Sequence, residues 1–132
     1  MTVLLAYVST PEGDAALAVA LKEATLRSSR AVVVNVTRPE AEIDSPFSAE
    51  QALDAVAERF ADAGVEVELR QVPPTSDVAQ AILDAADETG AELLVIGLRR
   101  RSPVGKFVMG STSQRILLGA GCPVVAVKVD ED

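Results

Sequence analysis

The sequence predicts an α/β fold in which a five-stranded parallel sheet carries helices on both faces. Short apolar runs alternate with longer stretches of helical periodicity along all 132 residues. The run at 31–37 is apolar at consecutive positions, which is expected of a strand buried on both faces. Strands that alternate with helices imply right-handed crossovers, so neighbouring strands should pair in parallel.

The first half of the chain predicts two strands and two helices. Residues 2–8 and 31–37 are the expected strands. Thr10 and Pro11 have the residue types of a helix N-cap and first helical position. A second helix is expected to begin at Pro46 and to end at Gly64. The apolar face of the first helix consists of Ala16, Leu17, Ala20, Leu21 and Ala24.

The second half predicts three strands and two helices. Residues 65–69 alternate between apolar and polar side chains, which indicates a strand with one wet face at a sheet edge. Further strands are expected at 92–97 and 123–129, with helices at 77–89 and 111–119. No change in composition suggests a second unit, so residues 1–132 are interpreted as a single domain.

The composition excludes several functions. The chain has no histidine and a single cysteine, Cys122, which excludes Ser-His-Asp and Cys-His catalysis within the chain and argues against a zinc site. Its apolar runs are strand-length, far below the ~20 residues of a membrane span. The net charge of -8 disfavours nucleic-acid binding. We therefore expect a cytoplasmic protein without a membrane or nucleic-acid partner.

Positive charge is concentrated near the end of this acidic chain. Residues 1–92 hold 17 acidic and 6 basic side chains, whereas residues 93–129 hold six basic side chains and no acidic one. Four of those bases lie within 99–106. This small cluster indicates an anion site, and the alternative is a solvated basic loop.

The segment 97–113 has the features of a phosphate-binding loop. Gly97 is expected to let the chain turn off its strand and to let a ligand approach the backbone. Ser111 and Gln114 have capping-box spacing, which predicts Ser111 as the helix N-cap and leaves the amides from Thr112 to Gln114 free for an anion. The alternative is that the glycines only make turns and Ser111 only caps.

In this loop the sequence resembles the universal stress protein family. The family pattern is Gly, two residues, Gly, nine residues, Gly, then Ser or Thr. Gly97, Gly110 and Ser111 keep this spacing, with Arg100 in place of the second glycine. The segments 115–117 and 122–127 and the order of the elements also resemble the family. A second departure is Val8, since an aspartate often stands there.

The resemblance implies a Rossmann-like fold of the adenine nucleotide alpha hydrolase-like type, with strand order 3-2-1-4-5. It also implies ATP, with or without Mg²⁺, between strands one and four, and a homodimer formed through the strand at 124–129. The implied phosphate contacts are Gly97, Arg99, Arg100, Gly110, Ser111, Thr112 and Ser113. The implied adenosine contacts are Ala6, Tyr7, Val8 and Val36.

Three functions remain open at this stage. The first is an adenine-nucleotide-binding regulatory protein of the stress response with little or no turnover, because residues 93–129 bring no acid to the phosphates. The second is a dimeric interaction module that binds no nucleotide. The third is a small phosphohydrolase that uses acids from the loop before the second helix, namely Glu40, Glu42 or Asp44.

Overall fold

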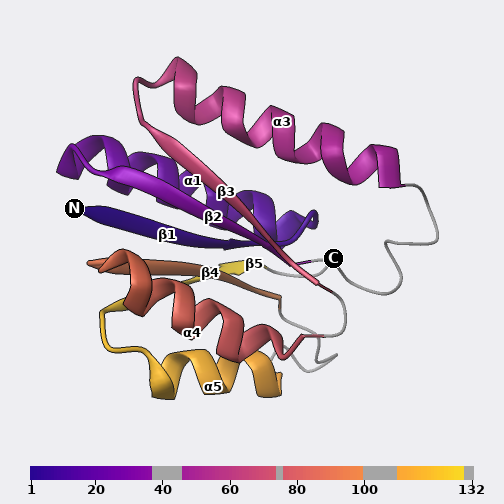
Figure 1. Cartoon of the computed structure of the whole chain (residues 1–132), viewed down its shortest axis with the longest axis vertical. Coiled ribbons are helices and arrows are strands. Elements are labelled where there is room, and N and C mark those ends of the chain that lie inside the picture. Colours follow the sequence, from indigo (N-terminus) through magenta and orange to yellow (C-terminus); the bar gives the residue numbers. More distant parts are fainter. Residues whose placement is uncertain (37–45, 74–75, 100–109, 130–132) are drawn as a thin grey trace.

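Five parallel strands form one sheet in the order β3-β2-β1-β4-β5 (Figure 1). The structure is a computed structural model that describes residues 1–36, 46–73, 76–99 and 110–129. Helices lie on both faces of the sheet, with α1 and α3 on one face and α4 and α5 on the other (Figure 1). The α/β class and the strand order expected from the sequence are confirmed.

The observed elements follow the predicted order within the described residues. The strands are β1 (Thr2–Tyr7), β2 (Arg30–Val36), β3 (Val67–Val72), β4 (Leu93–Arg99) and β5 (Val124–Val129). The helices are α1 (Pro11–Arg27), α3 (Pro46–Asp62), α4 (Val78–Thr89) and α5 (Ser111–Gly119). As predicted, β3 lies at an edge of the sheet.

The observed bounds of all five strands differ from the predicted ones by one to three residues, and two of these differences have clear local reasons. β3 starts at Val67 because Val65 still belongs to the turn after α3, where its amide donates to the Phe60 carbonyl at 2.9 Å. β1 ends at Tyr7 because the carbonyl of Val8 accepts the amide of Thr10 at 2.8 Å, which turns the chain.

The core has two apolar layers, one on each face of the sheet. Alternate side chains of β1 enter different layers: Leu5 packs with α1 and α3, whereas Leu4 packs with α4 and α5. Phe60 of α3 is completely buried in the first layer, and Ile82 of α4 is 1% exposed in the second. This packing fixes the helices relative to the strand ends.

Two of the described helices, α1 and α4, have N-termini that are capped by side chains. The hydroxyl of Thr10 accepts the Gly13 amide at 3.1 Å at the start of α1, and Pro11 is the first helical residue, as predicted. At α4, the carboxylate of Asp77 accepts the Gln80 amide at 3.2 Å. These bonds satisfy amides that have no partner inside the helix.

The predicted cap of α5 is wrong by one residue. The N-cap is Gly110, with φ −70° and ψ 163°, and Ser111 is the first helical residue. The amide of Gln114 donates to the Gly110 carbonyl at 3.0 Å, so the helical bonding pattern already starts at Gly110. No side chain caps α5. The amides without an acceptor inside the helix are therefore those of Ser111, Thr112 and Ser113, and not that of Gln114.

Candidate functional site

A cavity of about 300 Å³ opens between β1 and β4, where the order in which the chain adds strands to the sheet reverses. The chain leaves β1 for β2 on one side, and β4 pairs with β1 on the other. Ala6, Val36 and Gly97, near the carboxyl ends of these three strands, line the cavity. Ligands of open α/β sheets bind at this kind of reversal point.

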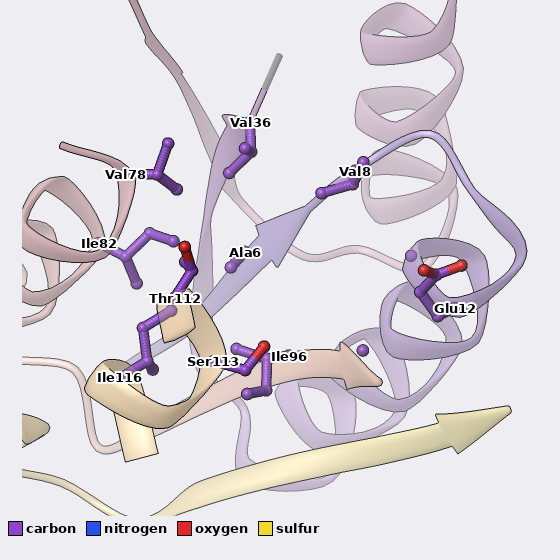
Figure 2. Close-up of a pocket in the computed structure, with 12 residues that line it drawn as sticks. Ala6, Val8, Glu12, Val36, Val78, Ile82, Ile96, Thr112, Ser113 and Ile116 are labelled. Atoms are coloured by element: carbon purple, nitrogen blue, oxygen red, sulfur yellow. The ribbon is translucent and has the colours of Figure 1, made fainter. Parts of the chain in front are cut away.

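The cavity has an apolar part and a polar part (Figure 2). Its aliphatic lining consists of Ala6, Val8, Val36, Val78, Ile82, Ile96 and Ile116. The polar lining consists of Glu12, Thr112 and Ser113, with Gly13 and Gly97 contributing only backbone. In Figure 2, Glu12 of α1 lies across the cavity from Val78 and Ile82 of α4. A mostly apolar cavity with a few polar groups is typical of small-molecule sites.

The N-terminus of α5 forms the anion-attracting wall of the cavity. Thr112 and Ser113 line the cavity from the first turn of this helix, and both bring hydroxyl groups. Since α5 has no side-chain cap, its first amides and the positive end of its dipole are available to an anion. At α1, by contrast, the Gly13 amide already donates to the Thr10 hydroxyl, and the first turn carries the acidic side chains of Glu12 and Asp14.

One part of the prediction for Gly97, the turn off the strand, is wrong, whereas its predicted contact with a ligand stays a prediction. Gly97 does not turn the chain: it lies inside β4 and pairs with Val127 of β5, and the strand continues to Arg99. A Cβ atom on Gly97 would lie 2.2 Å from the backbone oxygen of Glu12. Gly97 therefore lets the backbone of α1 approach β4, because only a residue without a side chain fits there.

Gly13 makes the matching contact at the end of β1. A Cβ atom on Gly13 would lie 1.7 Å from the backbone oxygen of Val8. Because neither glycine has a side chain, the first turn of α1 can pack closely against the ends of β1 and β4. This close packing brings Glu12 to the cavity, where its side chain is 5% exposed.

Six of the residues predicted to bind nucleotide line the cavity: Ala6, Val8, Val36, Gly97, Thr112 and Ser113. Gly110 and Ser111 lie at the start of α5 but are not among the lining residues. Arg99 ends β4, and its side chain lies outside the described residues, as do Arg100 and the acids Glu40, Glu42 and Asp44.

Tyr7 does not line the cavity. Its side chain is 4% exposed in the core layer formed with α1 and α3, and its hydroxyl donates to the Asp14 carboxylate at 2.9 Å. Burial, followed by the hydrogen bond to Asp14, raises the pKa of the Tyr7 phenol above its usual 10.0. This hydrogen bond connects the end of β1 to the first turn of α1, and Tyr7 lies on the face of the sheet that α1 and α3 cover.

The sequence interpretation missed half of the lining. The missed residues are Glu12, Gly13, Val78, Ile82, Ile96 and Ile116. Val78 and Ile82 belong to the helix predicted at 77–89, and Ile96 belongs to the strand predicted at 92–97. For Glu12, Gly13 and Val78 the sequence holds a usable signal, since each lies in the first turn of a helix that follows a strand end, where such cavities form. Glu12 also brings an acid to the cavity from α1, a helix that the sequence analysis did not connect with the site.

An ion pair joins the two helices on the α4 and α5 side of the cavity. The guanidinium of Arg115 donates to both carboxylate oxygens of Asp77, at 2.9 and 2.8 Å. The hydrogen bond from Arg115 is the main reason that the pKa of Asp77 lies below its usual 3.8. Because Asp77 also caps α4, it connects the start of that helix to α5.

The described part of the chain contains no group of three or more Cys, Asp or Glu side chains placed to hold a metal ion. Within the same residues, none of the helices has the length and apolar character that crossing a membrane requires. The described part of the site offers an apolar surface, an anion-attracting helix end and one buried carboxylate.

Fold and cavity together define a doubly wound α/β protein with a cavity at its switch point, the place where proteins of this class bind ligands. The Universal stress protein family model matches residues 1–128. The chain is 40% identical to a universal stress protein of Mycolicibacterium smegmatis over 126 residues, which cover 96% of each protein. It belongs to the universal stress protein family.

Solved structures agree with this assignment. A universal stress protein from Archaeoglobus fulgidus has a TM-score of 0.76 and 28% identity, covering 96% of this chain and 97% of that one. A structure of the universal stress protein from the same organism in complex with dAMP has a TM-score of 0.70, 25% identity and 96% coverage of both chains. The fold is also shared with an Arabidopsis thaliana family member with AMP bound, at a TM-score of 0.66 and 19% identity, covering 97% of this chain and 91% of that one.

Proposed function

We propose that this protein binds an adenine nucleotide, ATP in particular, in the cavity between β1 and β4. The observation that carries the proposal is the pairing of an aliphatic cavity with the uncapped N-terminus of α5. A purine base has the flat apolar faces that Val36, Val78 and Ile82 would contact. Phosphates would meet the amides and hydroxyls of the first turn of α5.

The family supports this ligand class. The Archaeoglobus structure with dAMP and the Arabidopsis structure with AMP each hold an adenine nucleotide. The cavity volume of about 300 Å³ is at the lower end of the range for small-molecule sites. It suits a base and its sugar, with the phosphates directed toward α5 and the residues that precede it.

We further propose a regulatory role in the stress response, which the family name implies, and little turnover. Phosphoryl transfer needs carboxylates that hold Mg²⁺ and a group that orients the nucleophile. Among the described residues that line the cavity, Glu12 is the one acid. ATP hydrolysis should therefore be far slower than the roughly 1–10³ s⁻¹ of typical enzymes.

A charge placed at the start of α5 tests the phosphate site. Thr112→Glu adds a carboxylate beside the amides of the first turn, where it should repel phosphate yet interact favourably with the helix dipole. We expect at least a tenfold loss of ATP affinity in calorimetry, a smaller loss for AMP, and no loss of thermal stability. Gln51→Glu, exposed on α3, is the matched control for added charge and should bind as the wild type does.

Nucleotide released from the purified protein by denaturation should be identified by mass spectrometry. If neither ATP, ADP nor AMP binds more tightly than ~1 mM, with or without Mg²⁺, and no nucleotide co-purifies, the proposal is wrong. The nucleotide-free dimeric module would then be the better interpretation.

A further inference from the structure

An ion pair lies beside the cavity, between the helix that offers the apolar wall and the helix that offers the anion-attracting wall. Asp77 directly precedes Val78, which lines the cavity from α4. Arg115 directly precedes Ile116, which lines it from α5. The Arg115 guanidinium donates to both oxygens of the Asp77 carboxylate, at 2.9 and 2.8 Å. A cation therefore stands on the same helix whose first turn would hold the phosphates of a nucleotide.

Helix geometry directs the Arg115 side chain toward the first turn of α5. Arg115 follows Thr112 by three residues and Ser111 by four, so the three residues lie along one side of the helix. Because side chains in a helix point back toward its N-terminus, a long side chain at this position covers the turn before it. The observed partner agrees with this direction: Asp77 lies at the start of α4, and Figure 1 shows α4 and α5 side by side with their first turns at the same end.

The described lining of the cavity brings no positive side chain to a phosphate. None of the described residues that line it is basic, and Arg115 is the single basic residue of α5. The open amides at a helix N-terminus amount to about half a positive charge, which is less than the negative charge of a phosphate group. A guanidinium supplies a full charge and planar donors that match phosphate oxygens. Arg115 is thus the described side chain best suited to complete a phosphate site at α5.

The contact with Asp77 leaves Arg115 suited to a second anion. Both hydrogen bonds use Nη1, so Asp77 does not occupy the edge formed by Nε and Nη2, through which a guanidinium can bind two phosphate oxygens at once. The two side chains are 49% and 54% exposed, so both have room to adjust to a ligand. One positive charge cannot fully stabilise two anions, and Asp77 must therefore weaken any phosphate contact that Arg115 makes.

We propose that Arg115 is a phosphate-binding residue of this site and that Asp77 limits the strength of its contact by sharing the same positive charge. The inference rests on the proposed nucleotide function, and it adds a cation that holds the phosphates and an acid that tunes it. Removal of the Arg115 charge should therefore weaken the binding of phosphorylated ligands alone, whereas removal of the Asp77 charge should strengthen it.

The first variant, Arg115→Gln, keeps a polar side chain but removes the charge. Hydrogen bonds to a charged group are strong, but half exposure screens them, so ATP should bind about 3- to 10-fold more weakly in calorimetry without Mg²⁺. Adenosine has no phosphate and should bind as it does to the wild type, which is measured by the shift in thermal unfolding at high ligand concentration. A merely structural role of the ion pair would weaken the binding of both ligands equally.

The second variant, Asp77→Asn, removes the competing charge and keeps an oxygen that can cap α4. ATP should bind up to about fivefold more tightly, which is the range that an exposed ion pair contributes. The double variant with Arg115→Gln should bind ATP as Arg115→Gln alone does, because Asp77 acts through Arg115. Asp84→Asn is the matched control: it removes an exposed acid of the same helix that bonds to Gln80 and does not line the cavity, and it should bind ATP as the wild type does.

The outcomes separate this inference from the proposed function. If Arg115→Gln binds ATP as tightly as the wild type does, or loses ATP and adenosine affinity equally, the nucleotide site stands and the role of Arg115 is overturned. If Asp77→Asn fails to raise ATP affinity, or raises it equally in the double variant, Asp77 does not act through Arg115 and its part in the inference is overturned. Binding of neither ligand by the wild type would overturn the proposed function itself.

Discussion

At the scale of single residues, the two glycines that hold α1 against the strand ends determine the shape of the cavity. Gly13→Ala would place a methyl group 1.7 Å from the Val8 carbonyl oxygen. Alanine normally stabilises a helix by up to ~1 kcal/mol relative to glycine, but this overlap forces the backbone to shift. We expect a net loss of roughly 1–3 kcal/mol in the free energy of unfolding, measured by urea denaturation.

Gly119→Ala is the matched control for that substitution. Its Cβ would lie 3.0 Å from a terminal methyl group of Leu83, and a flexible side chain can move away. This variant should be about as stable as the wild type. A Gly13→Ala protein with an unchanged urea midpoint and unchanged nucleotide affinity would show that the first turn of α1 is not held as closely as the packing indicates.

The same contacts explain which site residues could be predicted from the sequence. Side chains alternate along a strand, so Ala6 and Tyr7 had to face opposite sides of the sheet, and only Ala6 lines the cavity. It was therefore predictable from the sequence that only one of these two side chains could face the cavity. The place of Glu12 at the cavity was not predictable, because it depends on how closely α1 approaches β4, and this follows from the joint packing of Gly13 and Gly97.

At the scale of elements, helix ends and buried strands were predictable because their signals are local. Thr10 and Pro11 begin α1, and Gly90 ends α4 in the left-handed conformation. The range of α5 was predicted correctly, but its N-cap was misplaced, because a serine followed by glutamine three residues later also fits a helix that is capped by the preceding glycine. The end of β3 was missed because polar residues are tolerated in an edge strand.

The ion pair between α4 and α5 gives a prediction at this scale. Asp77→Asn should keep the helix cap, since asparagine caps as well as aspartate, but should weaken the contact with Arg115. Because the pKa of Asp77 is lowered in the folded protein, its stabilising effect is full above the usual value of 3.8 and is lost as pH falls through the lowered pKa. The wild type should therefore have a slightly higher urea midpoint than Asp77→Asn at pH 7.

That difference should vanish in acid below the lowered pKa, and it should shrink when salt is added, because both partners are about half exposed. The double variant Asp77→Asn with Arg115→Gln completes a thermodynamic cycle that isolates the pair. A difference that persists unchanged in acid and at high salt would assign the effect to helix capping and not to the ion pair.

At the scale of the whole molecule, the two edges of the sheet differ in how well they resist pairing with another chain. β3 carries Glu68 and Arg70, which form an ion-pair network with Arg30 and Glu88. On β5, at the other edge, Lys128 is the single charged residue. Charged side chains protect an edge strand from pairing, so β5 is the edge open to a second copy. We propose that two chains pair through β5 as a two-fold homodimer, as the family resemblance implies.

The bonding pattern of β5 identifies the substitution that tests this dimer. The amide of Leu94 donates to the Pro123 carbonyl at 3.0 Å, and in a parallel ladder the Leu94 carbonyl then accepts the amide of Val125. The amide of Ala126 consequently points to the open edge. Ala126→Pro removes a donor that only a partner chain would use, and proline is tolerated at such positions of edge strands.

We expect the wild type to have twice the 13.8 kDa chain mass in light scattering at micromolar concentration, and Ala126→Pro to be a folded monomer with an unchanged far-ultraviolet spectrum. Val125→Pro is the contrasting control, because it removes an amide that bonds to β4 and should destabilise the fold itself. A wild type that stays at 13.8 kDa would contradict the dimer. An Ala126→Pro variant that remains a dimer would show that the dimer interface does not involve the β5 edge.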